Sequence, residues 1–134
     1  MHGYFGHDAD IGIVGEGKSL ESAFESAALA LFSIETEPDR IAPEREIGFE
    51  FSEDDVEIAL VTWLNLLVAT ARAERLALGR FELTRSGNLW RGRAWGESWS
   101  ERTARGVEVK GATLTMLSVE KSGETWQARC VVDV

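Results

Sequence analysis

Hydrophobic positions along the chain change their spacing several times, and each change marks a predicted element. From residue 20 onward, apolar residues recur at helical intervals, which predicts a helix over Leu20–Phe32. Ser19 precedes this segment as an N-cap, and Glu21 falls in the first turn, where a carboxylate suits the helix dipole. Before it, Ile11–Val14 alternates apolar residues with glycine and predicts a strand.

A second strand and helix follow an acidic loop that carries both prolines, over Glu35–Pro43. Large apolar residues then alternate with polar ones, which predicts a half-buried strand over Glu46–Phe51. Ser52 stands three residues before Asp55 and fits a capping box, so we expect the second helix to follow and to end at Arg72–Arg75. Apolar residues cover most of this helix, which predicts that it is largely buried.

The rest of the chain is typical of strands separated by glycine-containing turns. The predicted strands are Arg80–Thr84 and Leu89–Trp95, which form a hairpin, then Val107–Glu120 and Thr125–Val134. This order of elements predicts an α+β fold, with two helices packed on one face of a mixed, mostly antiparallel sheet. Because the length and composition are those of one domain with a core, we expect residues 1–134 to form a single domain.

Composition narrows the cellular setting. No apolar run has the length expected of a membrane span, and residues 1–10 lack the pattern of a secretory signal. The single cysteine, Cys130, lies in an apolar predicted strand and is interpreted as an inert core residue in a reducing compartment. These features predict a cytoplasmic protein that does not associate with membranes.

Charge is strongly negative and unevenly distributed. The formal net charge of -9 argues against autonomous nucleic-acid binding, which needs basic residues to neutralise phosphates. Residues 35–57 contain ten acids and two bases, whereas residues 72–110 contain nine bases and five acids. Two interpretations are open: two solvated faces of opposite sign, or a basic segment that meets an acidic or phosphorylated partner.

The most chemically dense stretch lies near the start of the chain. His7, Asp8 and Asp10 place an imidazole and two carboxylates directly before the first predicted strand. Aspartates two positions apart resemble half of a calcium-binding loop, but the rest of that loop is missing. Taken alone, the stretch is either a hydrogen-bonded loop cluster or half of a cation site.

The final predicted strand offers a second set of oxygen ligands. Its alternation places Cys130, Val132 and Val134 on one face, and Val131 and Asp133 on the other. The Asp133 side chain and the α-carboxylate of Val134 then stand together at the end of the strand. Such oxygen-only groups suit Ca²⁺ or Mg²⁺, and the alternative is a solvated terminus.

Other motifs are less specific. Gly12 to Ser19 matches the spacing of a phosphate-binding loop, but a single domain of this size leaves little room for a nucleotide fold, so a turn that leads into an N-capped helix is the preferred interpretation. Both histidines fall within the first seven residues, and no Ser-His-Asp arrangement can be argued. Trp90, Trp95 and Trp99 lie near two arginines, which indicates cross-strand aromatic–arginine packing or, alternatively, a stacking surface.

Five short segments carry a common pattern from the first strand to the last. They are His7–Gly12, Gly17–Ala28, Asp55–Asn65, Glu108–Thr113 and Ala128–Val134. In this order and spacing they resemble the archease family over nearly the whole chain. The resemblance implies a small α+β protein that is not itself an enzyme. It further implies a cofactor for the GTP-dependent RNA ligase of tRNA splicing and RNA repair, which promotes guanylylation and turnover of the ligase.

The resemblance also implies site residues and a metal. Asp10, Asp133 and Val134, the last through its terminal carboxylate or carbonyl, match the ligands of a divalent cation, expected to be Ca²⁺ with Mg²⁺ or Mn²⁺ as alternatives. Lys110 matches a family lysine linked to activity, and His7 is left with an orienting role. The expected partner is the RNA ligase protein.

Three positions depart from the family pattern. Asp8 replaces a threonine, Leu66 replaces an acid in the second predicted helix, and Thr115 stands where the family has a histidine. They leave two further hypotheses beside ligase activation. One is a diverged chaperone-like or modification-assisting module. The other, a small hydrolase using His7, Asp8 and Asp10, lacks a nucleophile–base pair.

Overall fold

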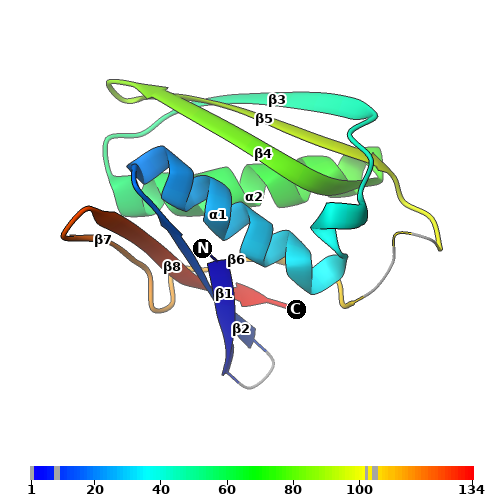
Figure 1. The fold of residues 1–134 in the computed structure, drawn as a ribbon, viewed down its shortest axis with the longest axis horizontal. Helices are drawn as coiled ribbons and strands as arrows, with labels where there is room; N and C mark the ends of the chain where they lie inside the picture. The colour runs from blue at the N-terminus through cyan, green and yellow to red at the C-terminus, as the bar shows by residue number, and fades with distance from the viewer. Residues whose placement is uncertain (1, 8–9, 102, 104–105) are drawn as a thin grey trace.

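Two antiparallel sheets enclose a layer of two helices in the computed structural model (Figure 1). The structure describes residues 2–7, 10–101, 103 and 106–134, and of residues 2 and 4–7 the backbone alone. The helices are α1 (Leu20–Glu35) and α2 (Val56–Glu74), and a short 3₁₀ helix spans Pro38–Arg40. The predicted α+β fold is confirmed, with the strands divided into two sheets on opposite sides of the helices.

The first sheet, here called the terminal sheet, joins the two ends of the chain. Its order is β1 (His2–His7), β2 (Asp10–Gly17), β8 (Thr125–Asp133) and β6 (Gly111–Ala112), and β7 (Ser118–Ser122) also pairs with β8. The second, here called the hairpin sheet, has the order β3 (Arg45–Ser52), β5 (Leu89–Ser98) and β4 (Leu76–Ser86). Every strand pairing among the described residues is antiparallel.

Both helices begin at side-chain caps. The Ser19 hydroxyl accepts the Ser22 N–H at 3.0 Å, and the Ser22 hydroxyl accepts the Ser19 N–H, so the predicted N-cap of α1 is confirmed. At α2, the Asp55 carboxylate accepts the N–H groups of Glu57 and Ile58 at 2.9 and 3.1 Å. The predicted capping box at Ser52 is wrong, because Ser52 belongs to β3 and Asp55 itself caps the helix.

The core centres on Trp63 of α2, which is fully buried. Its indole N–H donates to the Phe24 carbonyl of α1 at 3.1 Å, and its ring meets Phe49 edge-on, with centroids 6.0 Å apart. A Cβ at Gly92 of β5 would overlap this indole. Trp63 therefore connects both helices to the hairpin sheet, and Gly92 supplies the space it occupies.

The second helix is less completely buried than its composition predicts. One face is buried, while Ile58 on the other is 38% exposed. By length and composition alone, α2 could cross a membrane, since it has 19 residues and a mean hydropathy of 1.4. This corrects the expectation that no apolar run is long enough, although a core helix of a globular protein can pass the same test.

Two predictions for the strands are wrong. The predicted long strand Val107–Glu120 is mostly irregular, with β6 and β7 at separate places within it and Met116 at a φ of 52°. The turn expected over Gly15–Gly17 is instead the end of the regular strand β2, and a Cβ at Gly15 would overlap the Ala27 backbone of α1. These glycines permit close packing of strand on helix, and they leave no loop in which to hold a phosphate.

Candidate functional site

The register of the terminal sheet brings the two predicted aspartates together. Asp10 of β2 lies directly opposite Asp133 of β8. Opposite residues of an antiparallel pair point to the same face, with Cβ atoms about 4.5–5.5 Å apart. Because Cys130 and Val132 of β8 pack into the core, the Asp133 side chain lies on the outer face, where it is exposed and Asp10 is half-buried. The predicted faces of the final strand are confirmed.

The same row continues across neighbouring strands. His7 of β1 is opposite Asp10, and Gly111 of β6 is opposite Asp133. The structure describes only the backbone of His7, and Asp8 lies outside the described residues. Val134 is half-buried, and its side chain packs against the core. Its main-chain oxygens come directly after Asp133 in the chain.

Lys110 joins this row through the backbone. Its N–H donates to the Asp133 carbonyl at 2.8 Å, immediately before β6 begins. Lys110 itself is exposed, so its ammonium group is accessible to a partner. The structure therefore brings Asp10, near the start of the chain, together with Asp133, Val134 and Lys110 from its C-terminal part.

Three polar side chains from the helices hold the segment that carries Lys110. The Asn65 carboxamide donates to the Ala112 carbonyl at 3.2 Å and accepts the Ala112 N–H at 2.8 Å. Arg72 donates to the Val109 carbonyl at 2.9 Å, and Glu35 accepts the Val109 N–H at 2.8 Å. Sequence reasoning gave these three residues no such role. Asn65 carried a signal, because it is the one amide in an otherwise apolar stretch of α2.

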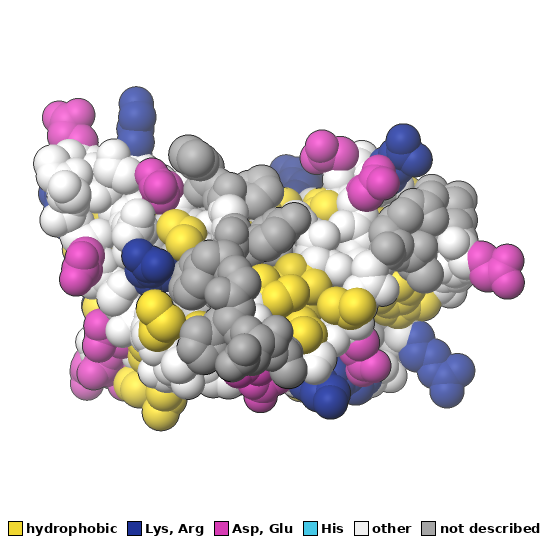
Figure 2. All heavy atoms as spheres, turned by 90° about the horizontal axis from the view of Figure 1, so that it is seen from below, with side chains coloured by type: hydrophobic (Ala, Val, Ile, Leu, Met, Phe, Trp, Pro, Cys, Tyr) yellow, Lys and Arg dark blue, Asp and Glu magenta, His cyan; other side chains and the backbone are white. Residues whose placement is uncertain are grey.

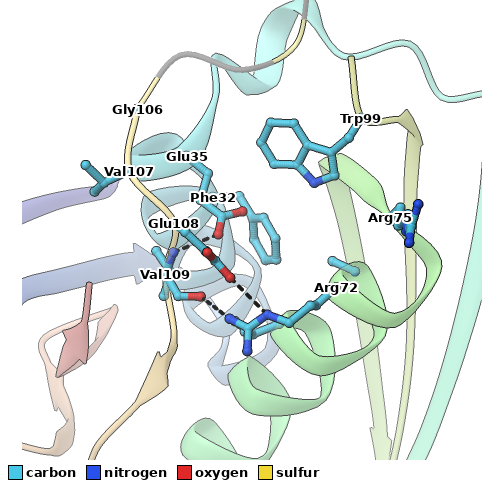
Figure 3. Close-up of a pocket in the computed structure, with 11 residues that line it drawn as sticks. Phe32, Glu35, Arg72, Arg75, Trp99, Gly106, Val107, Glu108 and Val109 are labelled. Carbon is cyan, nitrogen blue, oxygen red and sulfur yellow. Dashed lines mark hydrogen bonds and ion pairs between the residues drawn. The ribbon is translucent and has the colours of Figure 1, made fainter. Parts of the chain in front are cut away.

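The environment of Glu35 favours the protonated form of its carboxyl group. Desolvation by burial raises the pKa of its carboxyl group, the N–H of Val109 opposes this, and the Glu108 carboxylate raises the pKa further. The Arg72 guanidinium lowers it, but burial prevails. Figure 3 shows the Glu35 carboxylate above Val109 and Glu108. Ionised Glu35 therefore destabilises the folded chain relative to its neutral form.

We expect Glu35→Gln to raise the free energy of unfolding at pH 8. A carboxyl whose folded pKa is raised loses stability as pH rises through that pKa, and glutamine retains the neutral form with an oxygen for Val109. The gain should shrink as pH falls through the raised pKa toward the ordinary value of 4.5. Urea unfolding of both proteins between pH 4 and 8 measures it, and a gain that grows on acidification would contradict this assignment.

The hairpin sheet accounts for the tryptophan and charge patterns. The guanidinium groups of Arg80 and Arg93 lie over the Trp95 ring, 4.8 and 5.2 Å from its centroid, and the indole N–H donates to Glu46 at 3.0 Å. Arg91 pairs with Glu50 at 3.0 Å. Cross-strand aromatic–arginine packing is thus confirmed at Trp95. The interpretation of two faces of opposite charge is wrong, because acidic β3 and basic β5 lie side by side.

Remaining candidates have structural roles. Burial raises the pKa of the Cys130 thiol to about 12, which agrees with its interpretation as an inert core residue. Trp90 is fully buried and stacks with the rings of Phe24 and Phe51. The Thr115 carbonyl accepts the Val131 N–H at 3.1 Å, and Leu66 is half-buried on α2.

Comparison with known proteins decides the family. The model of the archease protein family (MTH1598/TM1083) matches residues 2–134. The chain belongs to the archease family. It is 35% identical to the protein archease of Sulfolobus acidocaldarius over 134 residues, which cover 98% of this chain and 96% of that protein. It is 34% identical to the protein archease of Pyrococcus furiosus over 137 residues, with the same coverage.

Solved structures of archeases share the fold. The solution structure of Methanobacterium thermoautotrophicum protein 1598 superposes with a TM-score of 0.84 at 27% identity, covering 99% of this chain and 98% of that one. The crystal structure of an archease from Thermotoga maritima, described as a possible chaperone, gives 0.70 at 24% identity, with 97% and 94% covered. The resemblance seen in the sequence and the predicted fold class are both confirmed.

Proposed function

We propose that this protein is a cation-dependent, non-enzymatic cofactor that activates a GTP-dependent RNA ligase. It would promote guanylylation and turnover of the ligase in tRNA splicing or RNA repair. One observation carries the proposal: Asp10 lies opposite Asp133 in the sheet, and the backbone N–H of Lys110 donates to the backbone carbonyl of Asp133. These are the residues that match the family's cation site and its lysine linked to activity.

The donor set fits a hard divalent cation. Among the described residues, no group of three or more histidine, cysteine, aspartate or glutamate side chains is close enough to hold a metal. The proposed ligands are instead two carboxylates, Asp10 and Asp133, which lie opposite each other in the sheet, and the main-chain oxygens of Val134. Oxygen-only sites suit Ca²⁺, with Mg²⁺ or Mn²⁺ as alternatives. When bound, the cation supplies a Lewis-acidic contact for a phosphate or carboxylate of the ligase. The Lys110 ammonium adds a second positive contact.

The surroundings of Lys110 suit contact with another protein. Leu114 and Met116, on the following segment, are 65% and 53% exposed. The backbone of Leu114 is fixed on both sides, because the Thr113 N–H donates to the Val131 carbonyl at 2.9 Å and the Thr115 carbonyl accepts the Val131 N–H; Met116 follows this segment directly. Viewed from the terminal-sheet side, hydrophobic side chains gather between charged groups of both signs (Figure 2). Exposed apolar side chains on a rigid backbone are typical of protein–protein contact sites.

The test is direct. The RNA ligase of the same organism is purified, and formation of the ligase–guanylate adduct from GTP is followed with and without this protein, in Ca²⁺, Mg²⁺ or Mn²⁺. We expect faster guanylylation and more ligation events per ligase molecule when this protein is added. A ligase whose guanylylation rate and turnover stay unchanged beside folded, cation-supplied protein would refute the proposal.

A second candidate is a chaperone-like or modification-assisting role without ligase activation. It is favoured by Leu66 and Thr115, which depart from the family pattern, and by the description of the Thermotoga maritima relative as a possible chaperone. The two roles differ in one measurement. A chaperone-like protein would suppress aggregation of a heated client protein at unchanged guanylylation rate, whereas an activator would accelerate guanylylation of a ligase that is already folded.

A further inference from the structure

A pocket of about 350 Å³ lies apart from the aspartate pair, between the C-terminal ends of α1 and α2 and the segment over residues 106–109 (Figure 3). Its size falls within the range of about 300–1,000 Å³ that is typical of ligand pockets. None of the three proposed cation ligands lines it. Its lining comprises Phe32, Glu35, Val68, Ala71, Arg72, Arg75, Trp99 and residues 106–109.

The inner part of the pocket is apolar, and two apolar side chains remain open at its mouth. Phe32, Val68 and Val109 are buried members of the core. Trp99 is 36% exposed and Val107 is 53% exposed, although both line the pocket. Burial of apolar surface contributes about 25 cal/mol per Å². An apolar group that enters beside Trp99 would therefore be stabilised by contact with this ring and with the apolar inner part of the pocket.

Most charged groups of the pocket are already paired. Arg72 lies 3.1 Å from the Glu108 carboxylate through Nε, and its Nη2 donates to the Val109 carbonyl. Glu35 accepts the Val109 N–H. In the described part of the chain, by contrast, the Arg75 guanidinium has no hydrogen-bond or ion-pair partner. Among the pocket's arginines, Arg75 is thus the one whose guanidinium is open to a ligand.

The backbone fixes Arg75 beside the open indole. Arg75 caps the C-terminus of α2 in the left-handed conformation, with a φ of 55°, and its N–H donates to the carbonyls of Ala71 and Arg72. The backbone carbonyl of Arg75 accepts the backbone N–H of Trp99 at 2.9 Å. Figure 3 shows both side chains on the same side of the pocket. An apolar contact and a cationic contact are therefore held next to each other.

We propose that this pocket binds a short segment of a partner protein in which a large apolar side chain is followed by an acidic residue. The apolar side chain enters beside Trp99, toward Phe32 and Val68, and the following carboxylate pairs with Arg75. A nucleotide fits less well, because a phosphate carries a charge of about -1.5 to -2 near pH 7. It would face the Glu35 and Glu108 carboxylates with a single free guanidinium to balance it.

The probe is a fluorescein-labelled Gly/Ser peptide of seven residues with a central phenylalanine followed by one glutamate. Fluorescence anisotropy with the full-length protein should show saturable binding. Two matched peptides separate the contributions: one has alanine in place of phenylalanine, and the other has glutamine in place of glutamate. We expect each to bind about tenfold more weakly, which corresponds to about 1.4 kcal/mol.

Variants at the mouth locate the site. Val107→Glu and Val107→Lys change one exposed position to opposite charges. We expect the first to weaken binding of the acidic peptide about tenfold and the second to strengthen it several-fold. Arg75→Gln should weaken binding about as much as the first. Arg80→Gln, the matched control, removes an arginine from the hairpin sheet outside the pocket and should leave binding unchanged.

Three results would overturn the proposal. They are no binding of the phenylalanine–glutamate peptide, equal binding by Arg75→Gln and parent proteins, and competition by guanosine monophosphate at lower concentrations than by unlabelled peptide. The readout is independent of the RNA ligase. Failure here would leave the proposed ligase activation standing, and failure of ligase activation would leave peptide binding at this pocket intact.

Discussion

Replacing Asp10 and Asp133 together by asparagine is expected to weaken divalent-cation binding by at least about 100-fold and to abolish ligase activation. Loss of a group that merely orients a metal ligand already costs about 10- to 100-fold in affinity, and here two charged ligands are lost. Both side chains lie on the outer face of the terminal sheet, so the fold should remain intact. Calorimetric titration with Ca²⁺ and the ligase guanylylation assay measure the two effects.

The matched control for this variant is Asp39→Asn with Asp54→Asn. These aspartates are exposed, lie outside the terminal sheet and produce the same change in net charge. The control should bind Ca²⁺ as the parent does. Unchanged Ca²⁺ affinity in the Asp10/Asp133 double variant would exclude this cation site.

A few residues appended after Val134 should also weaken cation binding, because they remove the terminal carboxylate.

Trp63→Ala is expected to lower the free energy of unfolding by about 3–5 kcal/mol. The indole is fully buried, fills the space above Gly92 and meets the Phe49 ring. Its removal leaves a cavity among two helices and the hairpin sheet, and it also removes the hydrogen bond to the Phe24 carbonyl. Urea unfolding followed by circular dichroism at 222 nm measures the loss.

Trp95→Ala serves as the comparison for Trp63→Ala. Its ring lies on the outer face of the hairpin sheet, against Arg80 and Arg93, and packing of this kind contributes about 0.5–1 kcal/mol at exposed sites. The expected loss is therefore several times smaller than at Trp63. Equal losses at the two positions would show that Trp63 is not the centre of the core.

Local patterns in the sequence predicted the helices well. Ser19 and the spacing of apolar residues after it placed the start of α1 correctly, because caps and amphipathic spacing act over a few residues. Alternation predicted the inner and outer faces of β8 for the same reason. Pairing of Asp10 with Asp133 depends on contact between the two ends of the chain, so the residues alone left it open. The family resemblance supplied that expectation.

The segment from Val107 to Glu120 shows why the remaining structure could not be predicted. Its β-branched residues favour an extended backbone, yet only β6 and β7 within it are strands. Several of its hydrogen bonds go to the side chains of Glu35, Asn65 and Arg72, and no propensity scale anticipates side-chain partners from distant helices. The division of the strands into two sheets was missed for a similar reason, since it depends on both helices being covered on two sides.

Asn65 has a consequence for self-association. The outward-facing N–H and C=O groups of Ala112 are the ones that an additional strand would use, and the Asn65 carboxamide occupies both. Open strand edges promote aggregation and edge-to-edge pairing between molecules. At β6, a side chain from a helix blocks that route with the same hydrogen bonds that a neighbouring strand would make. Assembly through β-sheet extension at this edge would first require the two hydrogen bonds between Asn65 of α2 and Ala112 to break.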